Sequence, residues 1–214
     1  MVGQGLLREC LLDSEMTNIL AIGRSALGHT GEKVREIIRK DLTDLSDIED
    51  EVRGYDACFF CLGATSAGLT EQEYRRLTYG ITLGVAQTLA KANPGMTFIY
   101  VSGMGADSSE QGRVMWARVR GETENALRKL PFKAVYVFRP GFIQPLHGIQ
   151  SRTKLYRAFY AVLAPLYPAL RQLAPNHVTT TEDLGRAMIE VAKHGAAVNV
   201  LEMRDIKNIR RDAI

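Results

Sequence analysis

Short apolar runs alternate with helical patterns along most of the chain, and this alternation constrains the fold more than any other feature. Strands are predicted over residues 17–24, 33–40, 55–62, 96–102, 133–139 and 197–203, and helices over 44–54, 70–91, 113–130 and 181–194. Strands separated by helices predict βαβ units, in which right-handed crossovers place helices on both faces of one parallel sheet. The expected fold is therefore α/β, a doubly wound parallel sheet in three α/β/α layers.

The composition fits one soluble domain and excludes several other classes. The 214 residues are 46% hydrophobic and 24% charged, which excludes disordered, collagen-like and disulfide-scaffold proteins. A net charge of +3 gives no argument for nucleic-acid binding. The three cysteines predict reduced thiols in a cytoplasmic protein, and Cys58 and Cys61 fit core packing in a strand better than a redox pair. The four histidines lack metal-ligand spacing, so we expect no metal.

The residues that follow each predicted strand are the first candidates for a site, because ligands of such sheets bind beyond the carboxyl ends of the strands. Small residues follow three strands, in the segments 62–66, 102–105 and 140–142. They would let a cofactor approach the backbone closely. The candidate cofactor-binding residues in these segments are Leu62, Gly63, Ala64, Pro140, Gly141 and Phe142.

Arg24 and Ser25 follow the first predicted strand, where dinucleotide folds usually carry an acidic residue that accepts from the ribose 2′-hydroxyl. A guanidinium cannot accept that hydrogen bond, but it pairs well with a 2′-phosphate. NADP is therefore the expected cofactor and NAD the alternative, unless Arg24 is simply a solvated loop residue. Asp41 and Leu42 follow the second strand, where Asp41 can accept from an adenine amino group or cap the next helix.

The order of the segments GRS, DLTD, CLGATSAG, YVSGMGAD, WARVRGETE and FRPGFIQP resembles the atypical short-chain dehydrogenase/reductase superfamily. It is most similar to the NAD-dependent epimerase/dehydratase-like proteins that have a single NAD(P)-binding domain. The resemblance covers nearly the whole chain. It implies one Rossmann-like domain over residues 1–214 that binds a nicotinamide dinucleotide across the strand ends, with residues 141–180 as a small lid or substrate-side segment.

The sequence departs from the family pattern at its start, where that pattern has a strand, a glycine-rich loop and a helix. Gly3 matches the last glycine of the loop, and neither the first strand nor the two earlier glycines precede it. Because the first strand is central in this fold, we expect the natural start to lie upstream of Met1. The alternatives are that the strand at 55–62 pairs directly with the strand at 17–24, or that a partner chain fills the gap.

The second departure concerns catalysis. By resemblance, reductases of this superfamily use a serine and a Tyr-x-x-x-Lys pair, in which the tyrosine passes the proton. Here Ser102 matches the serine, while Trp116 and Arg120 occupy the tyrosine and lysine positions. An indole has no accessible acid function, whereas an arginine can still hold ribose hydroxyls. His147 and Tyr156 are alternative proton donors.

Two functions follow from these residues. The first is an NADP-linked oxidoreductase or epimerase acting on a small carbonyl compound. The second is a cofactor-binding regulatory or assembly protein with little or no turnover. Aromatic residues recur at helical spacing over 151–175, which fits a lid, a membrane-surface or dimer-contact helix, or ordinary core packing. The basic tail after residue 203 is expected to be solvated.

Overall fold

The computed structural model describes residues 1–28, 31–149 and 175–212. Its centre is a parallel sheet of four strands in the order β3-β4-β5-β8. These strands are β3 (Ala57–Phe60), β4 (Thr97–Val101), β5 (Ala134–Arg139) and β8 (Val200–Glu202). The predicted α/β fold with a parallel central sheet is confirmed.

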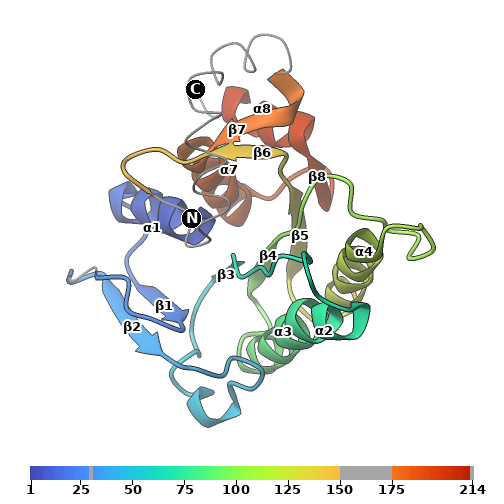
Figure 1. Ribbon diagram of the computed structural model, residues 1–214. Coiled ribbons are helices and arrows are strands. Elements are labelled where there is room, and N and C mark those ends of the chain that lie inside the picture. Colours follow the sequence, from blue (N-terminus) through green and yellow to red (C-terminus); the bar gives the residue numbers. More distant parts are fainter. Residues whose placement is uncertain (29–30, 150–174, 213–214) are drawn as a thin grey trace.

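Helices cover both faces of this sheet, as Figure 1 shows. One face packs against α3 (Ile81–Ala92) and α4 (Met115–Leu127), and the other against α1 (Val2–Leu12) and α7 (Thr181–His194). Side chains alternate along a strand, so Phe98 and Tyr100 lie in the first core while Ile99 between them lies in the second. The carboxyl ends of the central strands are thereby held at one edge between two packed layers.

A second, separate sheet contains only β1 (Ile19–Gly23) and β2 (Val34–Ile38), which pair in parallel. Among the strands that the structure describes, β1 pairs with β2 and not with β3, and Figure 1 shows the two apart. The alternative of direct pairing between the strands at 17–24 and 55–62 is therefore wrong for this structure. A third sheet, of β6 (Phe142–Gln144) and β7 (Val178–Thr180), was not predicted, because three residues are too few to show a period.

The helices α1 and α7 approach each other closely because each has a glycine at the contact. A Cβ added at Gly5 would lie 2.6 Å from the Cβ of Thr181, and one added at Gly185 would lie 3.1 Å from the Cγ of Glu9. Glu9 is only 4% exposed and accepts from Arg186 Nε at 2.9 Å. This contact joins residues that are far apart in the sequence.

Two predicted helices differ in the structure. The segment 44–54 forms only a 3-10 turn, η1 (Ser46–Ile48), and so the predicted helix there is wrong. Asp44 Oδ1 accepts from the Ser46 backbone N–H at 2.8 Å, a local bond that competes with helix formation. The predicted helix at 70–91 consists of α2 (Glu71–Arg75), a π-helical turn η2 (Arg76–Gly80) and α3, and it begins with the expected Thr70–Glu73 capping box.

The prediction of a solvated tail is wrong at Ile206, which is buried, whereas Arg204 and Asn208 are exposed as expected. Residues Met203–Asp212 form the helix α8, which follows β8. Elsewhere in the chain, a short turn η4 (Pro175–His177) precedes β7. Met203 and Ile206 are 3% and 2% exposed and belong to the same core as α1 and α7. Two apolar residues three positions apart anchor the helix, although the segment is basic overall.

Candidate functional site

A cavity of about 370 Å³ lies where the loops after β3, β4 and β5 meet the helices α2 and α4. It is at the carboxyl ends of parallel strands, the position at which ligands bind in this class of fold. The residues that line it are Ala64, Thr65, Ser66, Tyr74, Gly103, Met104, Trp116, Arg120, Pro140 and Gly141.

Arg120 supplies the positive charge in this cavity. Its Nε donates to the phenolic oxygen of Tyr74 at 3.1 Å. Its Nη atoms face the glycines of two loops, since a Cβ added at Gly103 would lie 3.7 Å from Nη1 and one added at Gly63 would lie 3.9 Å from Nη2. The guanidinium therefore lies between the loops after β3 and β4, at the cavity.

Trp116 forms a wall of the cavity and is the only tryptophan of the chain. The loop after β4 lies against its indole at Gly105, where an added Cβ would be 3.4 Å from Trp116 Cη2. Gly105 has a φ of +88°, a conformation that side chains rarely adopt. Trp116 thus gives the cavity an apolar surface and a spectroscopic reporter.

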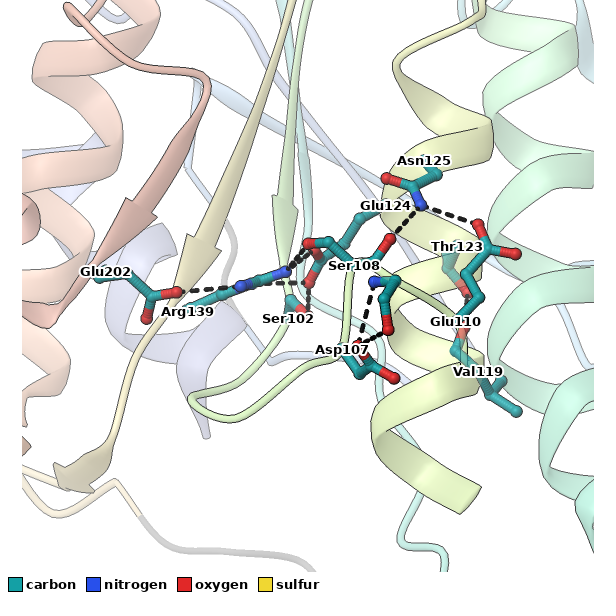
Figure 2. A network of polar contacts seen from close by, with 11 residues as sticks. Ser102, Asp107, Ser108, Glu110, Val119, Thr123, Glu124, Asn125, Arg139 and Glu202 are labelled. Carbon is teal, nitrogen blue, oxygen red and sulfur yellow. Dashed lines mark hydrogen bonds and ion pairs between the residues drawn. The ribbon is translucent and has the colours of Figure 1, made fainter. Parts of the chain in front are cut away.

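Ser102 belongs to a buried polar network next to the cavity, which Figure 2 shows. Its hydroxyl donates to Glu124 Oε1 at 2.5 Å, and Glu124 is only 1% exposed. Arg139 Nε donates to the same oxygen at 3.1 Å, and its Nη2 donates to the other one. Because the Ser102 proton is held by a carboxylate, Ser102 is not positioned to donate to a ligand in this arrangement.

The network also fastens the loop after β4 to the sheet. Arg139 Nη1 donates to Glu202 on β8 at 3.0 Å, and Nη2 donates to Ser108 Oγ at 2.6 Å (Figure 2). In the same loop Asp107 accepts from the Ser109 hydroxyl at 2.6 Å, and this hydrogen bond, with others from backbone N–H groups, lowers the pKa of Asp107. The loop that forms one wall of the cavity is therefore held from both sides.

The structure brings five of the predicted site residues together in the cavity. These are Ala64, Trp116, Arg120, Pro140 and Gly141. The other lining residues in the loops, Thr65, Ser66, Gly103 and Met104, lie in segments that the strand-end argument had singled out. Tyr74 was missed, because it comes from the buried face of α2 and no motif marks it.

The remaining predicted residues lie outside the cavity lining. Leu42 is 4% exposed and packs in the core, while Arg24 is exposed after β1. Asp41 accepts from the backbone N–H and the hydroxyl of Thr43, and the hydroxyl bond in particular lowers its pKa. Gly3 lies in the first turn of α1, beside Cys61. Gly63 adjoins the fork of Arg120, whereas Leu62, Ser25 and Phe142 do not line the cavity.

The alternative proton donors also lie elsewhere or outside the description. His147 Nε2 is 2.8 Å from Glu182 Oε2, at the start of α7, and does not line the cavity. Tyr156 and almost all of the segment 151–175 lie outside the described residues. Cys58 and Cys61 are free thiols, and burial raises the pKa of Cys61 to about 12, which disfavours the thiolate that redox chemistry needs.

Within 1–28, 31–149 and 175–212, no group of three or more His, Cys, Asp and Glu side chains is arranged to hold a metal ion. Over the same ranges, every helix is too short or too polar to cross a bilayer.

Curated proteins match part of the chain, while no protein-family model matches it. Protein HTATIP2 of Rattus norvegicus is 30% identical over 143 residues, which are 66% of this chain and 58% of the rat protein. Protein FMP52, mitochondrial, of Saccharomyces cerevisiae is 27% identical over 157 residues, which are 72% of this chain and 65% of the yeast protein. The chain thus spans less than two thirds of the length of both relatives, and the cytoplasmic location stays a prediction.

Solved structures match nearly the whole chain at low identity. A UDP-N-acetylglucosamine 4-epimerase from Methanobrevibacter ruminantium has a TM-score of 0.67 at 12% identity, and the match covers 94% of this chain and 71% of the epimerase. The dTDP-glucose 4,6-dehydratase DesIV from Streptomyces venezuelae, solved with NAD, has a TM-score of 0.66 at 16% identity, covering 99% and 77%. These matches show the fold, which is Rossmann-like.

Proposed function

We propose that this chain binds a nicotinamide dinucleotide and reduces a small carbonyl compound. Its fold confirms the resemblance to the epimerase/dehydratase-like short-chain dehydrogenases/reductases, and this supports the proposal. The observation that carries the proposal is the cavity at the carboxyl ends of three parallel strands, with Arg120 inside it. The substrate and the preference for NADP are parts of the proposal that the experiments below test.

The residues present fit such a cofactor. Ala64, Gly103 and Gly141 present little side chain to the cavity, so a flat ring and a ribose can approach the backbone. The hydroxyl of Ser66 supplies a polar contact at the same place, and the guanidinium of Arg120 adds a positive charge. Arg24 is exposed at the end of β1, where a guanidinium favours a 2′-phosphate over a free hydroxyl.

Tyr74 is the residue that we assign to proton transfer. A reduced nicotinamide, when bound, supplies a hydride to the carbonyl carbon. The phenol of Tyr74 gives its proton to the carbonyl oxygen, and the phenolate then recovers a proton from water. Tyr74 lines the cavity and accepts from Arg120, so a cation lies beside the oxygen that becomes negative. Trp116 has no acidic proton to give, and the Ser102 hydroxyl is held by Glu124.

The fluorescence of Trp116 offers a direct binding assay, because the chain has no other tryptophan and this one lines the cavity. NADPH and NADH absorb where tryptophan emits, so a bound cofactor quenches the signal. We expect saturable quenching by both, with NADPH binding about 10- to 100-fold more tightly, the range for a charge-assisted hydrogen bond. Arg24→Ala should remove this preference by weakening NADPH alone.

The control is Arg53→Ala, which removes another exposed arginine that pairs with Glu49. It should leave both titration curves unchanged. If a folded protein shows no quenching with either dinucleotide, the proposed function is wrong. If both quench equally and Arg24→Ala changes nothing, cofactor binding stands and the NADP preference is refuted.

A second candidate is a cofactor-binding protein without turnover, favoured by Trp116 at the tyrosine position and by the bond from Ser102 to Glu124. Consumption of NADPH across a panel of aldehydes and ketones separates the two candidates. We expect turnover, and we expect Tyr74→Phe to abolish it while the quenching curve stays unchanged. Binding without turnover on any compound would establish the second candidate instead.

A further inference from the structure

Arg120 is a partly buried guanidinium that forms no ion pair with any carboxylate of the described residues. Among the residues that the structure describes, its one hydrogen bond is to the phenolic oxygen of Tyr74. The nearby carboxylate of Glu124 is engaged by Ser102 and Arg139 instead. Arg120 remains charged at any ordinary pH, so its charge is present inside the cavity.

Arg139 shows what the same protein does with a buried arginine that has a structural role. It is 8% exposed, and two carboxylates and a serine hydroxyl surround its guanidinium. Burying a charge without a partner is costly, and buried arginines are normally paired in this way. The contrast shows that the missing partner of Arg120 is not supplied by the described residues. The Nη atoms of Arg120 lie between Gly63 and Gly103, at the cavity.

We propose that the cavity takes a ligand with an oxyanion group, a carboxylate or a phosphate, held by the Nη1 and Nη2 atoms of Arg120. Such groups match the fork of an arginine with two parallel hydrogen bonds. Trp116 and Met104 form the apolar surface against which the rest of the ligand packs. Among the described residues that line the cavity, none is acidic, so none opposes the anion.

This inference rests on the proposed function in one respect, which is that the oxyanion belongs to the carbonyl substrate. The substrate class is then an acid that also carries a ketone or aldehyde, rather than a neutral carbonyl compound. Tyr74 lies beside the anion site, because its oxygen is 3.1 Å from Arg120 Nε. The carbonyl of a short acid would therefore lie near the phenol when its anionic end is held by the fork.

The test compares benzoate with benzamide, which have nearly the same shape and differ in charge, and adds phenyl phosphate as the phosphate form. Binding to the full chain is measured by calorimetry and by Trp116 fluorescence. We expect benzoate to bind at least about tenfold more tightly than benzamide, the usual gain of a charge-assisted pair. Arg120→Gln should remove the difference, and Arg120→Lys should retain part of it, because lysine keeps the charge and loses the fork.

Arg118→Gln is the matched control, since Arg118 is on the same helix but pairs with Glu71 outside the cavity. It should leave benzoate binding unchanged. Circular dichroism checks that each variant folds. If Arg120→Gln does not fold, the comparison of Arg120→Lys with the unmodified protein still tests the inference. Equal binding of benzoate and benzamide, or no binding of benzoate or phenyl phosphate, would overturn the inference.

A titration of protein saturated with NADP⁺ identifies the source of the oxyanion. Benzoate that still binds and still depends on Arg120 indicates a separate acidic substrate, as we propose. Competition between NADP⁺ and both probes would mean that the fork holds a phosphate of the cofactor, and the substrate class would then be refuted. If benzoate binds through Arg120 while no dinucleotide binds at all, the anion site stands and the proposed function fails.

Discussion

Glu124→Gln replaces the carboxylate that holds Ser102 and Arg139 with a neutral amide of nearly the same shape. The carboxylate is 1% exposed, so the substitution leaves the Arg139 charge with a weaker partner inside the protein. Breaking a buried ion pair from one side costs about 3–5 kcal/mol. Arg139 keeps its bonds to Glu202 and Ser108, so we expect the lower end, about 3 kcal/mol. That is a large part of the roughly 5–15 kcal/mol that stabilises a typical domain.

Urea unfolding followed by circular dichroism measures this loss. With a slope of about 3 kcal/mol per molar urea, the midpoint should fall by about 1 M while the slope stays the same. The control is Glu122→Gln, two residues away on α4, where the carboxylate forms an exposed pair with Arg75. Such a pair contributes less than about 1 kcal/mol. If both variants lower the midpoint equally, the buried network is not the stabilising feature that we describe.

Four further substitutions test local features. Gly84→Ala places a Cβ 2.0 Å from a backbone carbonyl oxygen and should destabilise the protein by about 1–3 kcal/mol, whereas Gly80→Ala meets open space and should be neutral or stabilising in thermal melts. Thr70→Ala removes the capping box of α2 and should cost about 0.5–2 kcal/mol in urea unfolding. The hydrogen bond from Lys193 lowers the pKa of Asp13 in the folded protein. The ionised Asp13 therefore stabilises the fold above the ordinary aspartate pKa, and this stabilisation is lost as the pH falls through the folded pKa. Lys193→Met should make the free energy of unfolding, measured by urea unfolding at several acidic pH values, depend less on pH.

The central sheet was predictable because its strands are short apolar runs, which can be recognised in the sequence without knowledge of any long-range contact. Phe98, Ile99 and Tyr100 are buried on both faces of β4, and such a run has few alternatives. The position of the cavity followed from the general rule about strand ends. The helix α8 was not predictable in the same way, because the residues that bury Met203 and Ile206 come from other elements, such as α1 and α7.

The chemistry of the site was harder to predict than its position. Arg120 was identified through the family motif, but Tyr74 is 46 positions earlier in the chain and reaches it only through the packing of α2 on α4. Glu124 and Arg139 resemble surface residues when they are read as sequence. Their burial is a property of the pair, since neither charge would be stable inside the protein without the other.

The close contact of α1 with α7 has a consequence for how this protein is made. Translation adds about 5–20 residues per second, so the ribosome takes roughly 10–30 s to proceed from the end of α1 to the start of α7. During that interval the part of α1 that contacts α7, which includes Gly5, Leu6 and Glu9, lacks this partner. A nascent chain of this protein should therefore be a client of holding chaperones until α7 emerges, and ribosome-bound intermediates should be captured by them until that point.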